Sequence, residues 1–87
     1  MYCLEVKEHV FKIFKKLGKK DPKQMEAIDK KISQMLEDPF RFKPLRHPMQ
    51  NLRAVHTINP FVLVYEIDES RKVIIIRDYG HHDEVYK

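Results

Sequence analysis

Two apolar runs near the end of the chain constrain its fold more than any other feature. Residues 61–67 and 72–78 are rich in β-branched and aromatic side chains, and the polar residues 68–71 separate them. Runs of this length and composition with a polar turn between them predict a pair of antiparallel strands. Residues 51–58 alternate loosely between apolar and polar side chains. We therefore expect a three-stranded antiparallel meander in the second half of the chain.

The first half of the chain is predicted to form a short strand and two helices. Residues 2–6 are apolar apart from Glu5 and read as a strand. From residue 7 the apolar side chains recur on one helical face, lysines occupy the rest, and Gly18 is the expected end of this helix. Asp21 followed by Pro22 is a typical helix start, and the second helix should end at Asp38. The two helices then form an αα-hairpin.

The order strand, two helices and three strands predicts an α+β fold. Both helices should cover one face of the sheet, because each has a single apolar stripe to bury. Apolar residues on both registers of the last two strands indicate that the other face is not wholly solvated. A chain of 87 residues has room for one core, so we expect a single domain.

The charged residues are unevenly distributed. The net charge is +4, yet residues 39–65 contain no Asp or Glu. The basic side chains in this stretch are Arg41, Lys43, Arg46 and Arg53, accompanied by His47 and His56. An acid-free basic segment creates the positive potential that attracts phosphate groups.

Several classes of protein are disfavoured by the composition. A single cysteine, Cys3, cannot form an internal disulfide, and we expect it to be a small core side chain in a reducing, cytoplasmic compartment. The first residues do not follow the pattern of a signal peptide. No apolar run approaches the ~20 residues that a membrane helix needs, so no membrane partner is expected.

Taken together, these segments resemble the RelE/ParE toxin superfamily of type II toxin-antitoxin systems, and within it the RelE and YafQ type of mRNA interferase. The resemblance rests on the opening strand, the basic αα-hairpin, the Lys43-Pro44-Leu45 connector, residues 52–56, residues 61–65 and the closing residues 80–86. It implies a single RelE-like toxin domain over residues 1–87, with the RelE-like microbial RNase fold.

The resemblance also implies an activity and partners. Such toxins are ribosome-dependent endoribonucleases that cleave mRNA by attack of a ribose 2′-hydroxyl on the adjacent phosphate, without a metal or other cofactor. They are neutralised by a small RelB-like antitoxin and meet DNA only through the antitoxin complex. His82 and Tyr86 match the closing histidine and aromatic residue of YafQ-like toxins, and His56 matches a second family histidine.

The catalytic set combines features of two branches of this family. Lys43 stands where YafQ-like toxins have a histidine, and is closer to the lysine of RelE-like toxins. Val62 and His82 stand where RelE-like toxins have arginines.

Internal cleavage of RNA needs a base, an acid and cations that neutralise the charge on phosphorus. Histidine has the unperturbed pKa nearest neutrality, so His82 is the expected general acid, and His56 is either the base or a phosphate contact. Lys43, Arg46 and Arg53 are the expected charge neutralisers, Arg41 an RNA contact, and Tyr86 a stacking partner for a base. His81, His82 and Asp83 alone make a poor metal site, because the sequence offers no matching cluster.

The lysines of the first helix have two equally supported interpretations. Lys15, Lys16 and Lys19 form a solvated helix face or contact ribosomal RNA. Two further functions also compete with the ribonuclease. A ParE-like toxin would inhibit DNA gyrase without cutting RNA, and a plain nucleic-acid-binding module would need only the positive charge.

Overall fold

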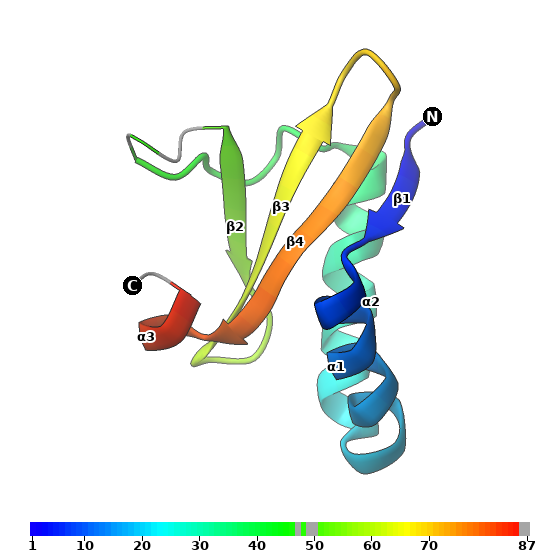
Figure 1. The fold of residues 1–87 in the computed structure, drawn as a ribbon, viewed down its shortest axis with the longest axis vertical. Coiled ribbons are helices and arrows are strands. Elements are labelled where there is room, and N and C mark those ends of the chain that lie inside the picture. The colour runs from blue at the N-terminus through cyan, green and yellow to red at the C-terminus, as the bar shows by residue number, and fades with distance from the viewer. Residues whose placement is uncertain (47, 49–50, 86–87) are drawn as a thin grey trace.

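The computed structural model describes residues 1–46, 48 and 51–85, and has the predicted α+β order of elements (Figure 1). The elements are β1 (Cys3–Val6), α1 (Glu8–Lys20), α2 (Pro22–Glu37), β2 (Leu52–His56), β3 (Phe61–Asp68), β4 (Val73–His81) and α3 (His82–Val85). The short helix α3 was not expected from the sequence, which predicted a polar tail after Gly80. The strand β4 also continues past Gly80 to His81.

The four strands form one sheet in the order β1-β4-β3-β2. Strands β2, β3 and β4 are antiparallel neighbours, which confirms the predicted meander. The first strand, β1, pairs in parallel with the last, β4. Strand β4 therefore lies between β1 and β3. The residues that follow β4 leave the sheet from an inner strand and not from an edge strand.

Both helices cover one face of the sheet, as predicted, and Figure 1 shows them side by side along β1 and β4. The core between the layers consists of Val10, Ile28, Ile32, Met35, Leu63, Tyr65, Ile74, Ile76 and Tyr79. Side chains of a strand alternate between faces, so Leu63 and Tyr65 point toward the helices while Val62 lies on the other face.

The face away from the helices is also partly buried. Val62 is 0% exposed and Val64 3%, although neither belongs to the core under the helices. Helix α3 covers one end of this face: a Cβ built on Gly80 would lie 3.5 Å from Val85 Cγ2. This agrees with the expectation that apolar residues on both registers leave the second face incompletely solvated.

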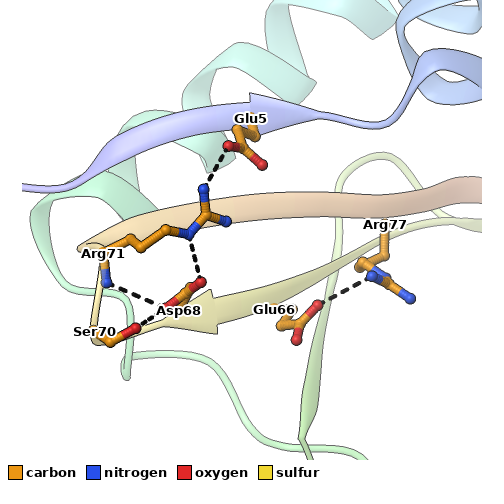
Figure 2. A network of polar contacts seen from close by, with 6 residues as sticks. All are labelled: Glu5, Glu66, Asp68, Ser70, Arg71 and Arg77. Atoms are coloured by element: carbon orange, nitrogen blue, oxygen red, sulfur yellow. Dashed lines mark hydrogen bonds and ion pairs between the residues drawn. The ribbon is translucent and has the colours of Figure 1, made fainter.

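A polar network closes the opposite end of the sheet (Figure 2). The Arg71 guanidinium donates to Asp68 Oδ2 at 2.8 Å and to Glu5 Oε1 at 3.1 Å, so it links β1 to the turn between β3 and β4. The hydrogen bond from Arg71 lowers the pKa of Asp68 to about 2. Glu66 and Arg77 form a separate cross-strand ion pair at 3.2 Å. These contacts position the edge strand and lie away from the histidines discussed below.

Two local predictions were wrong. Helix α1 does not end at Gly18 but runs on to Lys20, where the Asp21 N–H donates to Leu17 O at 2.8 Å. Lysines in the last turn interact favourably with the helix dipole, which helps the helix continue past the glycine. Cys3 is exposed rather than buried, because it lies on the edge strand β1, opposite Val73 and on the face away from the helices.

Replacing Gly18 with alanine should stabilise the protein by about 0.5–1 kcal/mol, since glycine is the poorer residue inside a helix. A Cβ at this position would meet no other atom within 4 Å, so no clash opposes the gain. Urea denaturation of both proteins measures the effect. An unchanged or lower midpoint would show that the last turn of α1 is not helical in solution.

Within the described residues, no helix is long and apolar enough to cross a membrane.

Candidate functional site

Two histidines that are distant in the sequence meet at one end of the sheet. The rings of His56 and His82 are stacked, with centroids 5.9 Å apart and planes inclined by 12°. His56 is the last residue of β2 and His82 the first of α3. Figure 1 shows α3 beside the end of β2. Both histidines are exposed, so their rings are accessible to a ligand.

The fold brings these histidines together through backbone pairing. Phe61 is opposite His81 in the β3–β4 register, so the chain that follows β4 returns to the loop between β2 and β3. There the His82 N–H donates to Pro60 O at 2.9 Å. Because residue 60 lies just before β3 and His56 just before that loop, this hydrogen bond sets α3 beside the end of β2.

The stacked pair is suited to proton transfer. An imidazole nitrogen can accept or donate a proton, and this geometry presents two imidazole rings to the same bound group. A pair of imidazoles therefore offers one group that can act as a proton acceptor and one that can act as a proton donor. Asp83 Oδ1 lies 3.5 Å from His82 Nδ1, and Asp83 Oδ2 lies 3.8 Å from His81 Nδ1. The Asp83 carboxylate therefore lies beside both imidazole rings.

The basic connector runs along the outer edge of β2. Pro44 forms an antiparallel bridge with Arg53, and the Leu45 N–H donates to Leu52 O at 2.8 Å. The Ala54 N–H donates to Lys43 O at 3.5 Å, which places Lys43 opposite Ala54. Ala54 and His56 are two residues apart on one strand and share a face. The register therefore places Lys43 on the same side of β2 as His56.

Arg53 lies on the other side of β2. It is opposite Tyr65 in the β2–β3 register, and Tyr65 belongs to the core beneath the helices. The Arg53 guanidinium donates to Phe42 O at 2.7 Å and lies 5.1 Å from the centroid of the Phe40 ring. Arg53 thus holds the connector, and the structure does not bring it together with the stacked histidines.

A buried tyrosine anchors the start of the connector. Tyr65 is 0% exposed, and its hydroxyl donates to Pro39 O at 2.7 Å. Its ring meets Phe42 edge-on, with centroids 6.4 Å apart. Sequence patterning identified Tyr65 only as a strand residue, because a contact between residues 26 positions apart leaves no periodic signal.

Burial raises the pKa of Tyr65 from 10.0 to about 12. An acid whose pKa is raised on folding keeps its proton in the folded state after the unfolded chain has lost it. The stability that this provides is complete below pH 10 and should be lost as the pH rises toward 12. Urea denaturation at several alkaline pH values should show a flatter decline for Tyr65→Phe than for the wild type. Identical slopes would mean that Tyr65 ionises freely in the folded protein.

The other predicted cations are exposed. Arg46 lies on the connector, and the Arg41 guanidinium carbon lies 5.8 Å from the centroid of the Phe42 ring. On α1, four lysines line a shallow hollow of ≈ 400 Å³: Lys12, Lys15, Lys16 and Lys19. Lys12 is paired with Glu8 at 3.6 Å. Tyr86 and His47 lie outside the described residues.

Val62 occupies the place next to His56 in the sheet. The two residues are opposite each other in the β2–β3 register, and Val62 is 0% exposed. The resemblance in sequence implies an arginine at this position in RelE-like toxins, and this chain has a buried apolar side chain there. Val62 is next to β2 on strand β3, and Lys43 is next to β2 on the connector. Lys43 is thus a basic residue on the same face of β2 as His56.

A second hollow, which sequence reasoning missed, lies on the helix side of the sheet. It has a volume of ≈ 360 Å³ and is lined by Ile13, Leu17, Gln24, Phe61, Tyr79, Gly80, His81 and Glu84. These residues come from both long helices, two strands and α3, so only the tertiary fold brings them together. No group of three or more potential metal ligands occurs in the part of the chain that the structure describes.

The fold just described matches that of known toxins. A model of the ParE toxin of the type II toxin-antitoxin system parDE matches residues 4–86. The "Putative toxin RelE4" of Methanocaldococcus jannaschii is 41% identical over 87 residues, which cover 100% of this chain and 93% of that protein. The chain belongs to the RelE/ParE superfamily of type II toxins, as its resemblance in sequence predicted.

Solved structures agree with this assignment. The free RelE toxin of E. coli, carrying two arginine-to-alanine substitutions, matches with a TM-score of 0.78 and 27% identity, covering 98% of this chain and 90% of RelE. The intact E. coli RelBE toxin-antitoxin complex contains a chain that matches with a TM-score of 0.77 and 23% identity, covering 93% of this chain and 96% of that one. The second likeness concerns the fold alone.

Proposed function

We propose that this toxin is a ribosome-dependent endoribonuclease that cleaves mRNA and so inhibits translation, without a metal or other cofactor. The observation that carries the proposal is the stacked pair of His56 and His82, with ring centroids 5.9 Å apart. Two exposed imidazoles in contact, with Lys43 on the same side of β2, provide an acid, a base and a cation for phosphate chemistry.

In this mechanism His56 accepts the proton of the ribose 2′-hydroxyl, and the 2′-oxygen attacks the adjacent phosphorus. His82 donates a proton to the 5′-oxygen as the bond between that oxygen and phosphorus breaks. Lys43 neutralises the charge that develops on the phosphate oxygens. His56 would alternatively contact the phosphate, with the base provided by another group. The mechanism requires one neutral and one protonated histidine at the start of the reaction.

The remaining basic residues would hold the RNA. Arg41 and Arg46 are exposed on the connector and suit contacts with mRNA phosphates. Lys15, Lys16 and Lys19 line one hollow with Lys12 and suit a ribosomal RNA backbone. Tyr86 would stack on an unpaired base.

We further propose that residues 1–87 act as one toxin domain in the cytoplasm, neutralised by a RelB-like antitoxin. The intact RelBE complex of E. coli is a toxin-antitoxin complex with the same fold for its toxin. An antitoxin that covers the basic connector or displaces α3 would separate the histidines from RNA. DNA would be met only through that complex.

A cell-free translation system with intact ribosomes tests the proposal directly. Purified toxin is added with one defined mRNA, and primer extension locates any new 5′ ends. The expected result is cleavage within the codon in the ribosomal A site, with none when both His56 and His82 are replaced by alanine. Intact mRNA and continued translation with the wild-type protein would reject the ribonuclease. Binding of RNA without cleavage would leave a nucleic-acid-binding module.

A second function is favoured by the family model, whose description is that of a ParE toxin. A ParE-like protein would inhibit DNA gyrase and would not need the histidine pair. A supercoiling assay with purified gyrase separates the two functions. Inhibition that survives replacement of both histidines would establish the gyrase function, and undisturbed gyrase would remove it.

A further inference from the structure

Phe40 is an exposed aromatic residue with a cation fixed over its ring. It is 52% exposed, and the Arg53 guanidinium carbon lies 5.1 Å from its ring centroid. We propose that Phe40 and Arg53 form a stacking platform for an unpaired base of single-stranded RNA. This inference rests on the proposed function, because it takes RNA as the ligand.

The Arg53 guanidinium is held in position beside the Phe40 ring by a hydrogen bond. Its Nη1 donates to Phe42 O at 2.7 Å, which fixes the guanidinium plane near Phe40. A guanidinium over one part of an aromatic ring is attracted by the ring quadrupole and restricts the motion of that ring. An aromatic ring that is already ordered loses less conformational entropy when a base stacks on it.

Hydrogen bonds also hold the backbone at Phe40 in place. The Phe40 N–H donates to Asp38 Oδ1 at 3.2 Å, and the preceding Pro39 carbonyl accepts from the buried Tyr65 hydroxyl at 2.7 Å. The backbone at Phe40 is therefore held by hydrogen bonds, and its ring is held by the Arg53 guanidinium. About half of its surface nevertheless remains available to a ligand.

The charge around Phe40 favours a nucleic acid as the ligand. Asp38 is hydrogen-bonded to the Phe40 backbone, whereas residues 39–65 contain no Asp or Glu, Arg41 is exposed next to Phe40 in the chain, and the Arg53 guanidinium lies 5.1 Å from the ring centroid. Aromatic side chains beside cations are the usual elements of single-stranded nucleic-acid sites: the base stacks on the ring and the cations contact the backbone. A partner protein's apolar side chain would gain nothing from the absence of acidic residues.

The platform lies apart from the proposed reacting atoms. Arg53 and His56 are three residues apart on β2, which is about 10 Å along a strand, and they lie on opposite sides of it. A base at Phe40 would thus belong to a nucleotide away from the cleaved bond. We expect Phe40 to affect RNA affinity and leave the rate of the bound complex nearly unchanged.

Phe40→Trp provides a direct optical test, because the chain contains no tryptophan. Its fluorescence is titrated with a 2′-O-methylated oligoribonucleotide, which cannot be cleaved by 2′-oxygen attack. A matched oligonucleotide without bases is the control for charge alone. Stacking predicts quenching by the first oligonucleotide only. Equal effects of both would reduce the site to a phosphate contact and overturn the platform.

Phe40→Leu and Phe11→Leu form a matched pair for affinity, because Phe11 is also an exposed phenylalanine, at 54%. Neither change alters the charge. Fluorescence anisotropy with a labelled oligonucleotide should show roughly tenfold weaker binding for Phe40→Leu, and near wild-type binding for Phe11→Leu and Phe40→Tyr. Equal affinity of Phe40→Leu and wild type, or no measurable binding by the wild type, would overturn the inference.

The outcomes separate this inference from the proposed function. Stacking at Phe40 without mRNA cleavage in the translation system would reject the ribonuclease and keep the platform. If the Phe40→Leu protein cleaves mRNA and binds RNA with unchanged affinity, the ribonuclease is kept and the platform is rejected. Neither result depends on the other, because the binding assays use RNA that the mechanism cannot cut.

Discussion

Replacing His82 with alanine is expected to slow mRNA cleavage by about 10²- to 10⁴-fold, the usual contribution of a general acid or base. The variant loses the proton donor for the leaving 5′-oxygen and the ring that stacks on His56. The measurement is the single-turnover cleavage rate on ribosomes that hold a defined codon in the A site. RNA affinity should change little, because the connector cations and the α1 lysines remain.

His9→Ala is the matched control for this experiment. His9 is also an exposed histidine beside a carboxylate, with Nε2 3.6 Å from Asp78 Oδ1, but it lies on α1. The His9→Ala protein should cleave mRNA at the wild-type rate. Cleavage by His82→Ala at the wild-type rate would remove His82 from the chemistry and leave His56 and Lys43 as the groups to test.

The His56→Ala and His82→Ala variants should also be combined. If the two rings act as one acid-base unit, the double variant should be little slower than the slower single variant. Multiplication of the two single effects would instead indicate independent roles, such as a proton donor and a separate phosphate contact. The double-mutant comparison therefore tests the stacked geometry itself.

Replacing Ile76 with alanine should cost about 2–5 kcal/mol of folding free energy, the range for large-to-small changes in a core. Ile76 is 0% exposed and lies in the core between the helices and the sheet. It is opposite Val6 of β1 and Tyr65 of β3, so the cavity would open where three strands meet. Urea denaturation with extrapolation to water gives the difference in free energy.

Ile58→Ala removes the same atoms from a residue that is 44% exposed, in the loop between β2 and β3. Its cost should stay within about 0.5 kcal/mol. Similar losses at both positions would mean that the layer between sheet and helices is not the main core. Since loss of stability also lowers activity, the Ile76→Ala protein is a useful reference for toxicity lost through unfolding alone.

Much of the fold was predictable because its elements carry strong local patterns. The apolar runs at residues 61–67 and 72–78 correspond to β3 and β4. Asp21 does cap the start of α2, with its side chain accepting from the Gln24 N–H at 3.2 Å. Gly18 was misread because an isolated glycine marks a helix end only if the following residues stop the helix, and Lys19 and Lys20 continue it.

The candidate site was predictable by residue type but not by arrangement. His56 and His82 were identified from chemistry and resemblance, and the structure places them in contact. Lys43 and Arg53 looked equivalent as cations, yet the bridge between Pro44 and Arg53 puts them on opposite sides of β2. A shift of one residue in that pairing would exchange the two sides.

The amino-acid order alone therefore specified the two long helices, the meander, the acid-free basic segment and the family. The helices and strands depend on side chains a few residues apart, whose periodicity is visible in the sequence, whereas the basic segment and the family depend on which residues follow one another along the chain. The meeting of His56 with His82, the fixing of Arg53 over Phe40 and the burial of Tyr65 depended on strand register and on the return of the chain after β4. Such contacts join residues 13 or more positions apart, where packing between layers rather than local propensity determines which side chains meet.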